Sequence, residues 1–381
     1  MKPFSRLAAA STLAIAVVVS LGTPAFAHSQ NGSRHNSRGA GRAVFVQTDD
    51  PAGNRVVAYR ADDGTLTEAG TYATGGNGGV LAGSVVDHLA SQASLTYDAK
   101  HALLFAVNAG SNTVSVFSVH GDQLNLRQTI PSFGEFPVSI AVHDELVYVL
   151  NALAGGSVQG YRIRSHHLDP IDDSSRALGL DPAATPQFVN TPGQVAFSLD
   201  GSQLIVTTKA NGSAIDVFRV NRHGTLSDAP VVNSEPGTVP FAVTFDQAGH
   251  LVVTEAGTNA LATFELHDDG TITLLQALPT GQAATCWVVG SEGQFYASNA
   301  GSASLSRFDS GSDGTLAFLD NTTTDAGTVD AAVSANGHYL YVQAGASGMV
   351  DGFRINSDGS LTKIGSVTVP NAVGGEGIVA V

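Results

Sequence analysis

The sequence is poor in residues that mark several classes of protein. It holds 1 cysteine in 381 residues, and 18 Lys and Arg against 33 Asp and Glu, for a formal charge of −15. A single thiol excludes an intrachain disulfide, so packing must stabilise the fold. Because neutralising phosphates requires clustered cations, we expect no nucleic-acid partner.

The residues that are abundant indicate a turn-rich β protein. There are 43 glycines, and hydrophobic residues make up 43% of the chain. Glycine suits the tight turns that join short strands. The apolar content is enough for a sizeable core and excludes global disorder.

The first 27 residues have the pattern of a signal peptide. Two cations precede an uncharged, mostly apolar run from Leu7 to Leu21, and the small-residue motif Ala25-Phe26-Ala27 follows. This order of regions is typical of secretory signals. A membrane anchor is the weaker alternative, because spanning requires about 20 apolar residues. We therefore expect cleavage after Ala27 and a secreted or extracytoplasmic protein.

Residues 28–42 differ in composition from the rest of the chain. They are rich in Ser, Gly and Asn and carry three arginines. This composition predicts a flexible basic leader. No stretch after the signal peptide is long and apolar enough to predict a membrane span.

One unit is repeated seven times between residue 43 and the end of the sequence. Each copy has an aromatic residue seven or eight positions ahead of a Leu or Ile, with a turn signature between them. Successive copies are 44 to 46 residues apart, except for two spacings of 58. The signatures are Asp63-Gly64-Thr65-Leu66, Gly121-Asp122-Gln123-Leu124, His166-His167-Leu168, His223-Gly224-Thr225-Leu226, Asp269-Gly270-Thr271-Ile272, Asp313-Gly314-Thr315-Leu316 and Asp358-Gly359-Ser360-Leu361.

This repeat predicts an all-β, seven-bladed propeller over residues 43–381. Each unit contains four short strands, and four strands at a period near 45 residues are typical of propeller blades. The first unit lacks an innermost strand, while Gly377 to Val381 form a strand with nothing after it. We expect the two ends to pair and close the first blade. A β-sandwich array and a β-helix are the rival folds.

The two long repeats predict which face of the ring carries the functional site. Their extra residues fall in Thr74–Ala93 and Asp169–Thr191, which link one blade to the next. Such links lie on the face opposite the Asp-Gly turns, around the mouth of the central channel. Long loops on a rigid scaffold are common functional elements.

Polar residues gather at the same face, at the ends of second strands or ahead of innermost strands. They offer hydrogen bonds and carboxylates suited to a small polar ligand, and we predict that Asn108, Asn151, Gln194, Asn299 and Glu135 bind substrate. For each Asn, capping of a turn is the alternative. The full set is Asn108, Asn151, Lys209, Glu255, Asn299, Gln343, Glu135, Gln194, Asp330 and Glu376.

The units resemble a known family, the lactonase-type seven-bladed propellers. This family includes bacterial 6-phosphogluconolactonase and fungal carboxymuconate-lactonising enzymes, and the resemblance extends to secreted members. It covers nearly all of residues 43–381. The motifs that carry it are Ser91-Gln92-Ala93-Ser94-Leu95, Asn108-Ala109-Gly110-Ser111-Asn112-Thr113-Val114-Ser115-Val116-Phe117, Tyr148-Val149-Leu150-Asn151-Ala152, Gly193-Gln194-Val195-Ala196-Phe197-Ser198, Cys286-Trp287-Val288-Val289 and the repeated Asp-Gly-Thr-Leu.

The resemblance implies opening or closing of a lactone ring by His, Arg and Glu at the channel mouth. Glu255 stands where the family carries a Glu. The family's Gly-Pro-Arg-His motif is replaced here by 191–194 (Thr-Pro-Gly-Gln) and 238–241 (Thr-Val-Pro-Phe). The Arg and His are therefore missing.

Three residues are the catalytic candidates. A lactonase requires a base to activate water and a cation or donors for the oxyanion. We predict Glu255 as the base and Lys209 as the electrophile, with His88, beside Asp87, as a second acid or base. Cys286 is expected to be a buried structural thiol.

Two functions are consistent with these residues. The first is a secreted lactone hydrolase that acts on a small lactone or sugar-acid-type substrate. The alternative is a non-catalytic extracellular propeller that binds a glycan or another partner. A divalent metal such as calcium is left open, because no spacing of a metal-binding motif supports it.

Overall fold

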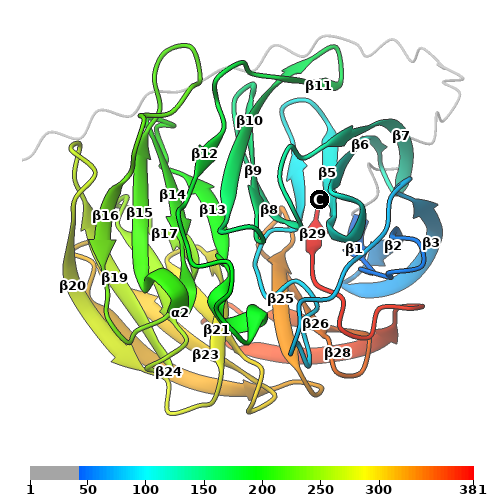
Figure 1. Ribbon diagram of the computed structural model, residues 1–381. Helices are drawn as coiled ribbons and strands as arrows, with labels where there is room; N and C mark the ends of the chain where they lie inside the picture. The colour runs from blue at the N-terminus through cyan, green and yellow to red at the C-terminus, as the bar shows by residue number, and fades with distance from the viewer. Residues whose placement is uncertain (1–42) are drawn as a thin grey trace, which may run out of the picture. The chain divides into compact units, whose positions relative to one another are not determined.

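The computed structural model describes residues 43–381, so the predicted signal peptide and leader lie outside the described residues. Seven antiparallel sheets surround one axis, and each follows a path of four strands. The innermost strand of every blade contacts the innermost strands of both neighbouring blades, which completes the ring. Figure 1 shows the chain passing around this ring until red β29 returns to blue β1. The predicted seven-bladed propeller is confirmed.

Blades 1 to 4 each run from an innermost strand at the axis to an outermost strand at the rim. In that order, their strands are β29 (Ile378–Ala380), β1 (Ala43–Gln47), β2 (Arg55–Asp62) and β3 (Thr65–Ala73); β4 (Leu95–Asp98), β5 (Leu103–Asn108), β6 (Thr113–His120) and β7 (Gln123–Pro131); β8 (Pro137–His143), β9 (Leu146–Asn151), β10 (Ser157–Arg164) and β11 (His167–Pro170); and β13 (Gln194–Phe197), β14 (Gln203–Thr207), β15 (Ala214–Arg219) and β16 (Val231–Ser234).

Blades 5 to 7 follow the same order. They are β17 (Pro240–Phe245), β18 (Leu251–Glu255), β19 (Ala260–Leu266) and β20 (Ile272–Pro279); β21 (Thr285–Ser291), β22 (Gln294–Asn299), β23 (Ser304–Ser310) and β24 (Leu316–Thr323); and β25 (Thr328–Val333), β26 (Tyr339–Ala344), β27 (Met349–Ile355) and β28 (Leu361–Thr368). The remaining elements are β12 (Arg176–Ala177), η1 (Ala109–Ser111), α1 (Gln187–Asn190) and α2 (Lys209–Gly212).

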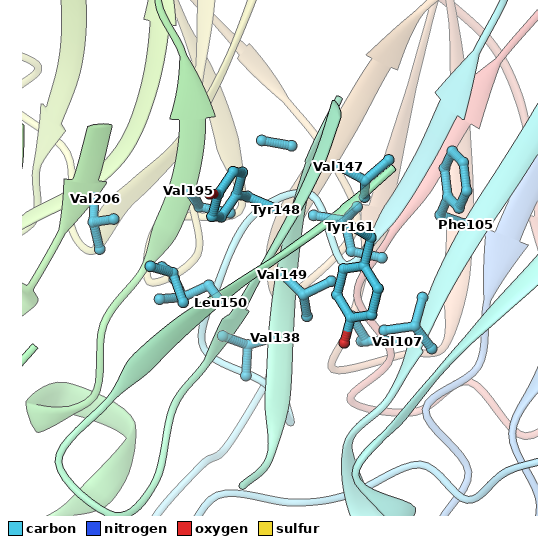
Figure 2. Close-up of a cluster of buried hydrophobic side chains, with 14 of the residues drawn as sticks. Phe105, Val107, Val138, Val147, Tyr148, Val149, Leu150, Tyr161, Val195 and Val206 are labelled. Atoms are coloured by element: carbon cyan, nitrogen blue, oxygen red, sulfur yellow. The ribbon is translucent and has the colours of Figure 1, made fainter. Parts of the chain in front are cut away.

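Burial changes from the axis to the rim of each blade. All six residues of β5 are buried, because both faces of that strand pack on neighbouring blades. The outer strand β7 is mostly exposed instead. Figure 2 shows one resulting core, in which side chains of β9 in blade 3 lie between those of β5 in blade 2 and β14 in blade 4. Apolar contact between blades therefore stabilises the ring.

The Asp-Gly signatures form the turns between the third and fourth strands. Gly270 and Gly314 have φ of +90° and +78°, in the left-handed region that favours glycine. Asp269 Oδ1 accepts hydrogen bonds from the N and Oγ1 atoms of Thr271, at 2.9 and 2.6 Å. The repeated Asp-Gly-Thr sequence thus supplies both the backbone conformation and its side-chain support.

The last strand closes the ring as predicted. β29 pairs antiparallel with β1, with Phe45 opposite Val379. Hydrogen bonds continue past both ends of the pairing, from Val381 N to the Ala43 carbonyl at 2.8 Å and from Gln47 N to the Gly377 carbonyl at 2.9 Å. The first blade therefore contains both ends of the propeller. Within residues 43–381 no helix is long and apolar enough to cross a membrane.

Candidate functional site

The first insertion enters the central channel, and Ser91 anchors it there. Ser91 Oγ donates hydrogen bonds to the Val138 carbonyl at 2.9 Å and to Glu376 Oε2 at 3.0 Å. The Ser91 carbonyl accepts a hydrogen bond from Trp287 Nε1 at 2.5 Å. Groups from three blades therefore hold one serine.

The next residue, Gln92, is held in the same way. Its side chain exchanges two hydrogen bonds with the Val288 backbone, at 2.9 and 3.0 Å, and its N–H donates to the Gly193 carbonyl at 3.2 Å. The partners of Ser91 and Gln92 belong to blades 1, 3, 4 and 6, on different sides of the axis. Ser91 and Gln92 thus occupy the channel at their level, and we call residues 84–94 the axial segment. A ligand at this level would bind in a cavity beside the axis.

Such a cavity lies beside the axial segment, bounded also by blades 4, 5 and 6. Its volume is about 150 Å³. Three lining residues carry ionisable side chains: Asp87, Lys209 and Cys286. The large apolar lining residues are Val85, Val86, Phe188, Val189, Val239 and Phe241. Both insertions line the cavity. They also contact each other next to it, where Ala82 N donates a hydrogen bond to Gln187 Oε1 at 2.9 Å.

Asp87 is the carboxylate of this cavity. Its Oδ1 and Oδ2 atoms accept hydrogen bonds from Leu89 N at 2.9 Å and Ser91 N at 3.1 Å. Burial raises the pKa of Asp87 to about 6, although these backbone donors and the nearby Lys209 charge oppose the rise. A carboxylate with such a pKa is mostly ionised at neutral pH and still accepts a proton well.

Lys209 is the cation of the cavity, at only 1% exposure. Its Nζ donates to the Ala90 carbonyl at 2.6 Å, the Phe188 carbonyl at 2.7 Å and Thr191 Oγ1 at 3.2 Å. Burial lowers the pKa of Lys209 to about 7, opposed chiefly by the Asp87 charge. Because an ammonium has three hydrogens, all of them are already used in tying the axial segment to the second insertion.

Cys286 and Trp287 form the wall that blade 6 contributes. Cys286 is half-buried rather than fully buried as predicted. Desolvation raises the pKa of its thiol to about 12, so the thiol is not an activated nucleophile. Trp287 is buried and its ring packs edge-on against Phe241 at 5.0 Å between centroids. It is the single tryptophan of the chain.

Further carboxyl groups are buried where the axial segment meets the closing strand. Glu376 accepts from Ser91, its N–H donates to Asp49 Oδ2 at 2.8 Å, and its side chain is hydrogen-bonded to Asp330. Burial raises the pKa of Asp49 to about 8 and of Asp330 to about 7. Burial and the neighbouring acids raise the pKa of Glu376 well above its usual value. These carboxyl groups therefore retain protons near neutral pH.

No cluster of three or more His, Cys, Asp or Glu residues within 43–381 is placed to hold a metal ion. The buried acids instead accept hydrogen bonds from protein groups, as Asp49 does from Gln47 Nε2.

Comparison with known proteins decides the family. Residues 84–376, more than half of the chain, match the sequence model of the family described as "Lactonase, 7-bladed beta-propeller". The chain belongs to this lactonase family. No curated protein matches the sequence.

Solved structures share the fold of this lactonase-family protein at low sequence identity. A proposed 6-phosphogluconolactonase from Bacteroides uniformis is 19% identical with a TM-score of 0.73, over 90% of this chain and 100% of the other. The periplasmic gluconolactonase of Pseudomonas aeruginosa is 18% identical with a TM-score of 0.72, over 89% and 99%. Virginiamycin B lyase from Staphylococcus aureus is 13% identical with a TM-score of 0.54, over 77% and 90%.

The predicted catalytic residues of this lactonase-family protein differ in their relation to the cavity, and their catalytic role remains a prediction. Lys209 lines the cavity, whereas Glu255 and His88 are not among the described residues that line it. Glu255 is buried, its Oε2 accepts from Thr258 Oγ1 at 2.8 Å, and burial raises its pKa. His88 N donates to the Gly374 carbonyl at 2.8 Å, and burial lowers the pKa of its ring.

The amide side chains that were predicted to bind substrate make hydrogen bonds to other residues of the protein. Asn108 Nδ2 donates to Ser115 Oγ at 2.8 Å, and Asn299 Nδ2 donates to Ser306 Oγ at 2.9 Å. These equivalent bonds join the second and third strands of blades 2 and 6. They fit the alternative of a structural role for each Asn.

The other predicted binding residues differ in exposure. Asn151 is buried and its Nδ2 donates to the Ser132 carbonyl at 3.3 Å. Gln194 Oε1 accepts from Val243 N at 2.7 Å, which links blades 4 and 5. Glu135 is exposed on a loop. The substrate-binding role of all five residues remains a prediction.

Sequence reasoning did not select Asp87, the carboxylate that lines the cavity. The available signal was its place in the first insertion, beside His88, on the predicted functional face. Its burial depends on how the axial segment enters the channel, which the sequence pattern does not encode.

Proposed function

We propose that this protein hydrolyses a lactone in the cavity beside Asp87. Membership of the lactonase family supports this chemistry. The observation that carries the proposal is a carboxylate with a pKa near 6 at the wall of a cavity of about 150 Å³. A base of that strength accepts a proton from water as the water attacks a carbonyl carbon.

The reaction follows from the groups in the cavity. Asp87 accepts a proton from water, and the water oxygen bonds to the lactone carbonyl carbon. The ring carbon–oxygen bond then breaks, and the leaving oxygen takes the proton back from Asp87. The Lys209 charge favours the developing oxyanion, while its three hydrogen bonds hold the residues around Asp87 in place.

The test compares the same substitution at two aspartates, one in each insertion. Asp87→Asn should lower kcat by about 100-fold or more, because it removes the base. Asp172→Asn is the control, because Asp172 is exposed in the second insertion. Hydrolysis of alkyl and sugar lactones would be followed by acid release. Full activity of a folded Asp87→Asn protein would overturn the assignment.

We also propose that the enzyme acts outside the cytoplasm, after removal of residues 1–27. The charged start, the apolar run and Ala25-Phe26-Ala27 support export. N-terminal sequencing of protein recovered outside the cytoplasm should begin at His28. Recovery of full-length protein from the cytoplasm alone would contradict export.

A further inference from the structure

The cavity beside Asp87 has features that select among lactones. We infer that it accepts neutral lactones carrying an aliphatic substituent, in preference to anionic or polyhydroxylated sugar lactones. This inference rests on the proposed lactone hydrolysis. It is carried by the apolar walls, the occupied hydrogens of Lys209 and the Asp87 carboxylate at the cavity wall.

The charges at the site disfavour an anionic substrate. Lys209 is the one cationic side chain among the described lining residues, and Ala90, Phe188 and Thr191 already accept its three hydrogens. A phosphate or carboxylate would have to displace one of these acceptors. It would also stand near the Asp87 carboxylate. Burying an anion without a free partner is strongly unfavourable.

The walls also disfavour a sugar ring. Val85, Val86, Val189, Val239 and Phe241 present only apolar side chains to the cavity. Hydroxyl groups of a sugar lactone would lose hydrogen bonds to water without replacement. An alkyl substituent loses none, and its burial is favourable. Val85 is 81% exposed, so the cavity is accessible from solvent.

The volume limits the length of the substituent. An apolar cavity of about 150 Å³ holds roughly a benzene-sized group. Each methylene buried should tighten binding about fourfold, until the cavity is full. Affinity should therefore rise with chain length and then level off.

The fluorescence of Trp287 reports whether a ligand occupies the cavity, because Trp287 is the chain's single tryptophan and lines the cavity. Its fluorescence would be titrated with γ-lactams bearing alkyl chains of increasing length, since lactams resist hydrolysis. Glucono-δ-lactam and 6-phosphogluconate are the polar and anionic probes. We expect a saturable signal that tightens about fourfold per methylene for the alkyl series, and none for the polar probes at equal concentrations. Equal or tighter binding of either polar probe would overturn the inference.

Two substitutions connect the signal to this cavity. Ala300→Leu and Ala256→Leu each narrow it, and each should weaken alkyl-lactam binding at least tenfold. Ala346→Leu is the control, since Ala346 is exposed in a turn of blade 7. Unchanged binding in both narrowed variants would contradict the location.

The outcomes separate the two proposals. Saturable alkyl-lactam binding without turnover of any lactone would contradict the proposed function alone. Turnover of gluconolactone without alkyl-lactam binding would contradict the substrate class alone.

Discussion

The two faces of the propeller use aspartate in opposite ways. On the face of the Asp-Gly turns, Asp269, Asp313 and Asp358 are exposed, and hydrogen bonds from the following Thr or Ser lower their pKa. Around the axis, burial raises the pKa of Asp87 and Asp330 instead. The first group repeats in successive blades, whereas Asp87 and Asp330 have no counterpart in the other blades. Between these two sets, the aspartates that depart from the repeat are the ones with a raised pKa.

The largest effect that would test this contrast is removal of the buried cation. Lys209→Met leaves Asp87 and its neighbours without a positive charge, and we expect a loss of about 3 kcal/mol or more in the free energy of unfolding. The substitution adds no new backbone strain, because Lys209 already adopts a left-handed conformation, with φ of +52°. Urea unfolding would measure the loss.

The control for Lys209 is an exposed lysine. Lys100 forms ion pairs with Asp144 and Glu145 at 3.0 Å, but its side chain is 52% exposed. Lys100→Met should leave the unfolding midpoint nearly unchanged. Equal losses in the two variants would remove the distinction between the axis and the surface.

The second test uses pH. Folding raises the pKa of Asp49 from 3.8 to about 8 and of Asp330 from 3.8 to about 7. A group whose pKa is raised by folding stabilises the protein at low pH, and this stability is lost as pH rises through the folded pKa. Lys209, with a pKa of about 7, does not offset the loss below that pH. We expect the free energy of unfolding to fall by about 2 kcal/mol or more from pH 5 to pH 7.

Glu376→Gln should make that pH dependence shallower, because it removes one titrating carboxyl and keeps an oxygen for Ser91. Glu265→Gln is the matched control, since the Glu265 side chain is 56% exposed on β19. Denaturation at several pH values would give the slopes. Identical slopes in wild type and Glu376→Gln would show that the buried acids do not govern stability.

The smallest effect is expected on the turn face. Asp313 Oδ1 accepts from the N and Oγ1 atoms of Thr315 at 3.1 and 2.7 Å. Asp313→Ala removes this support and should lower Tm by a few degrees, while Asp313→Asn retains an acceptor and should change Tm less. A larger loss for Asn than for Ala would contradict the turn-supporting role.

The repeat determined what the sequence could predict. Turn signatures such as Asp313-Gly314 depend on neighbours in the chain, so seven copies predicted the blades, and the spare strand before Val381 predicted closure. The site depends instead on contacts between distant residues. Ser91 meets Val138 and Glu376 only after the ring forms. No local pattern indicated that the first insertion enters the channel.

Lys209 and Glu255 show that the repeat predicts the position of a residue in a blade but not the surroundings of its side chain. Both stand at the ends of second strands, so the repeat correctly assigned them to one face. It did not predict which side chain would line a cavity, because that depends on the path of the axial segment. Asp87 was missed for this reason.

The bond from Ser91 to Glu376 makes the arrangement of the site depend on a residue that is synthesised 285 positions later. Glu376 stands five residues before Val381, whereas Asp87 lies within the first quarter of the sequence. A polypeptide released early from the ribosome therefore lacks this anchor for the segment that carries Asp87. Chains that end before Glu376 should therefore be unstable, and the arrangement around Asp87 should form only once that residue has been synthesised.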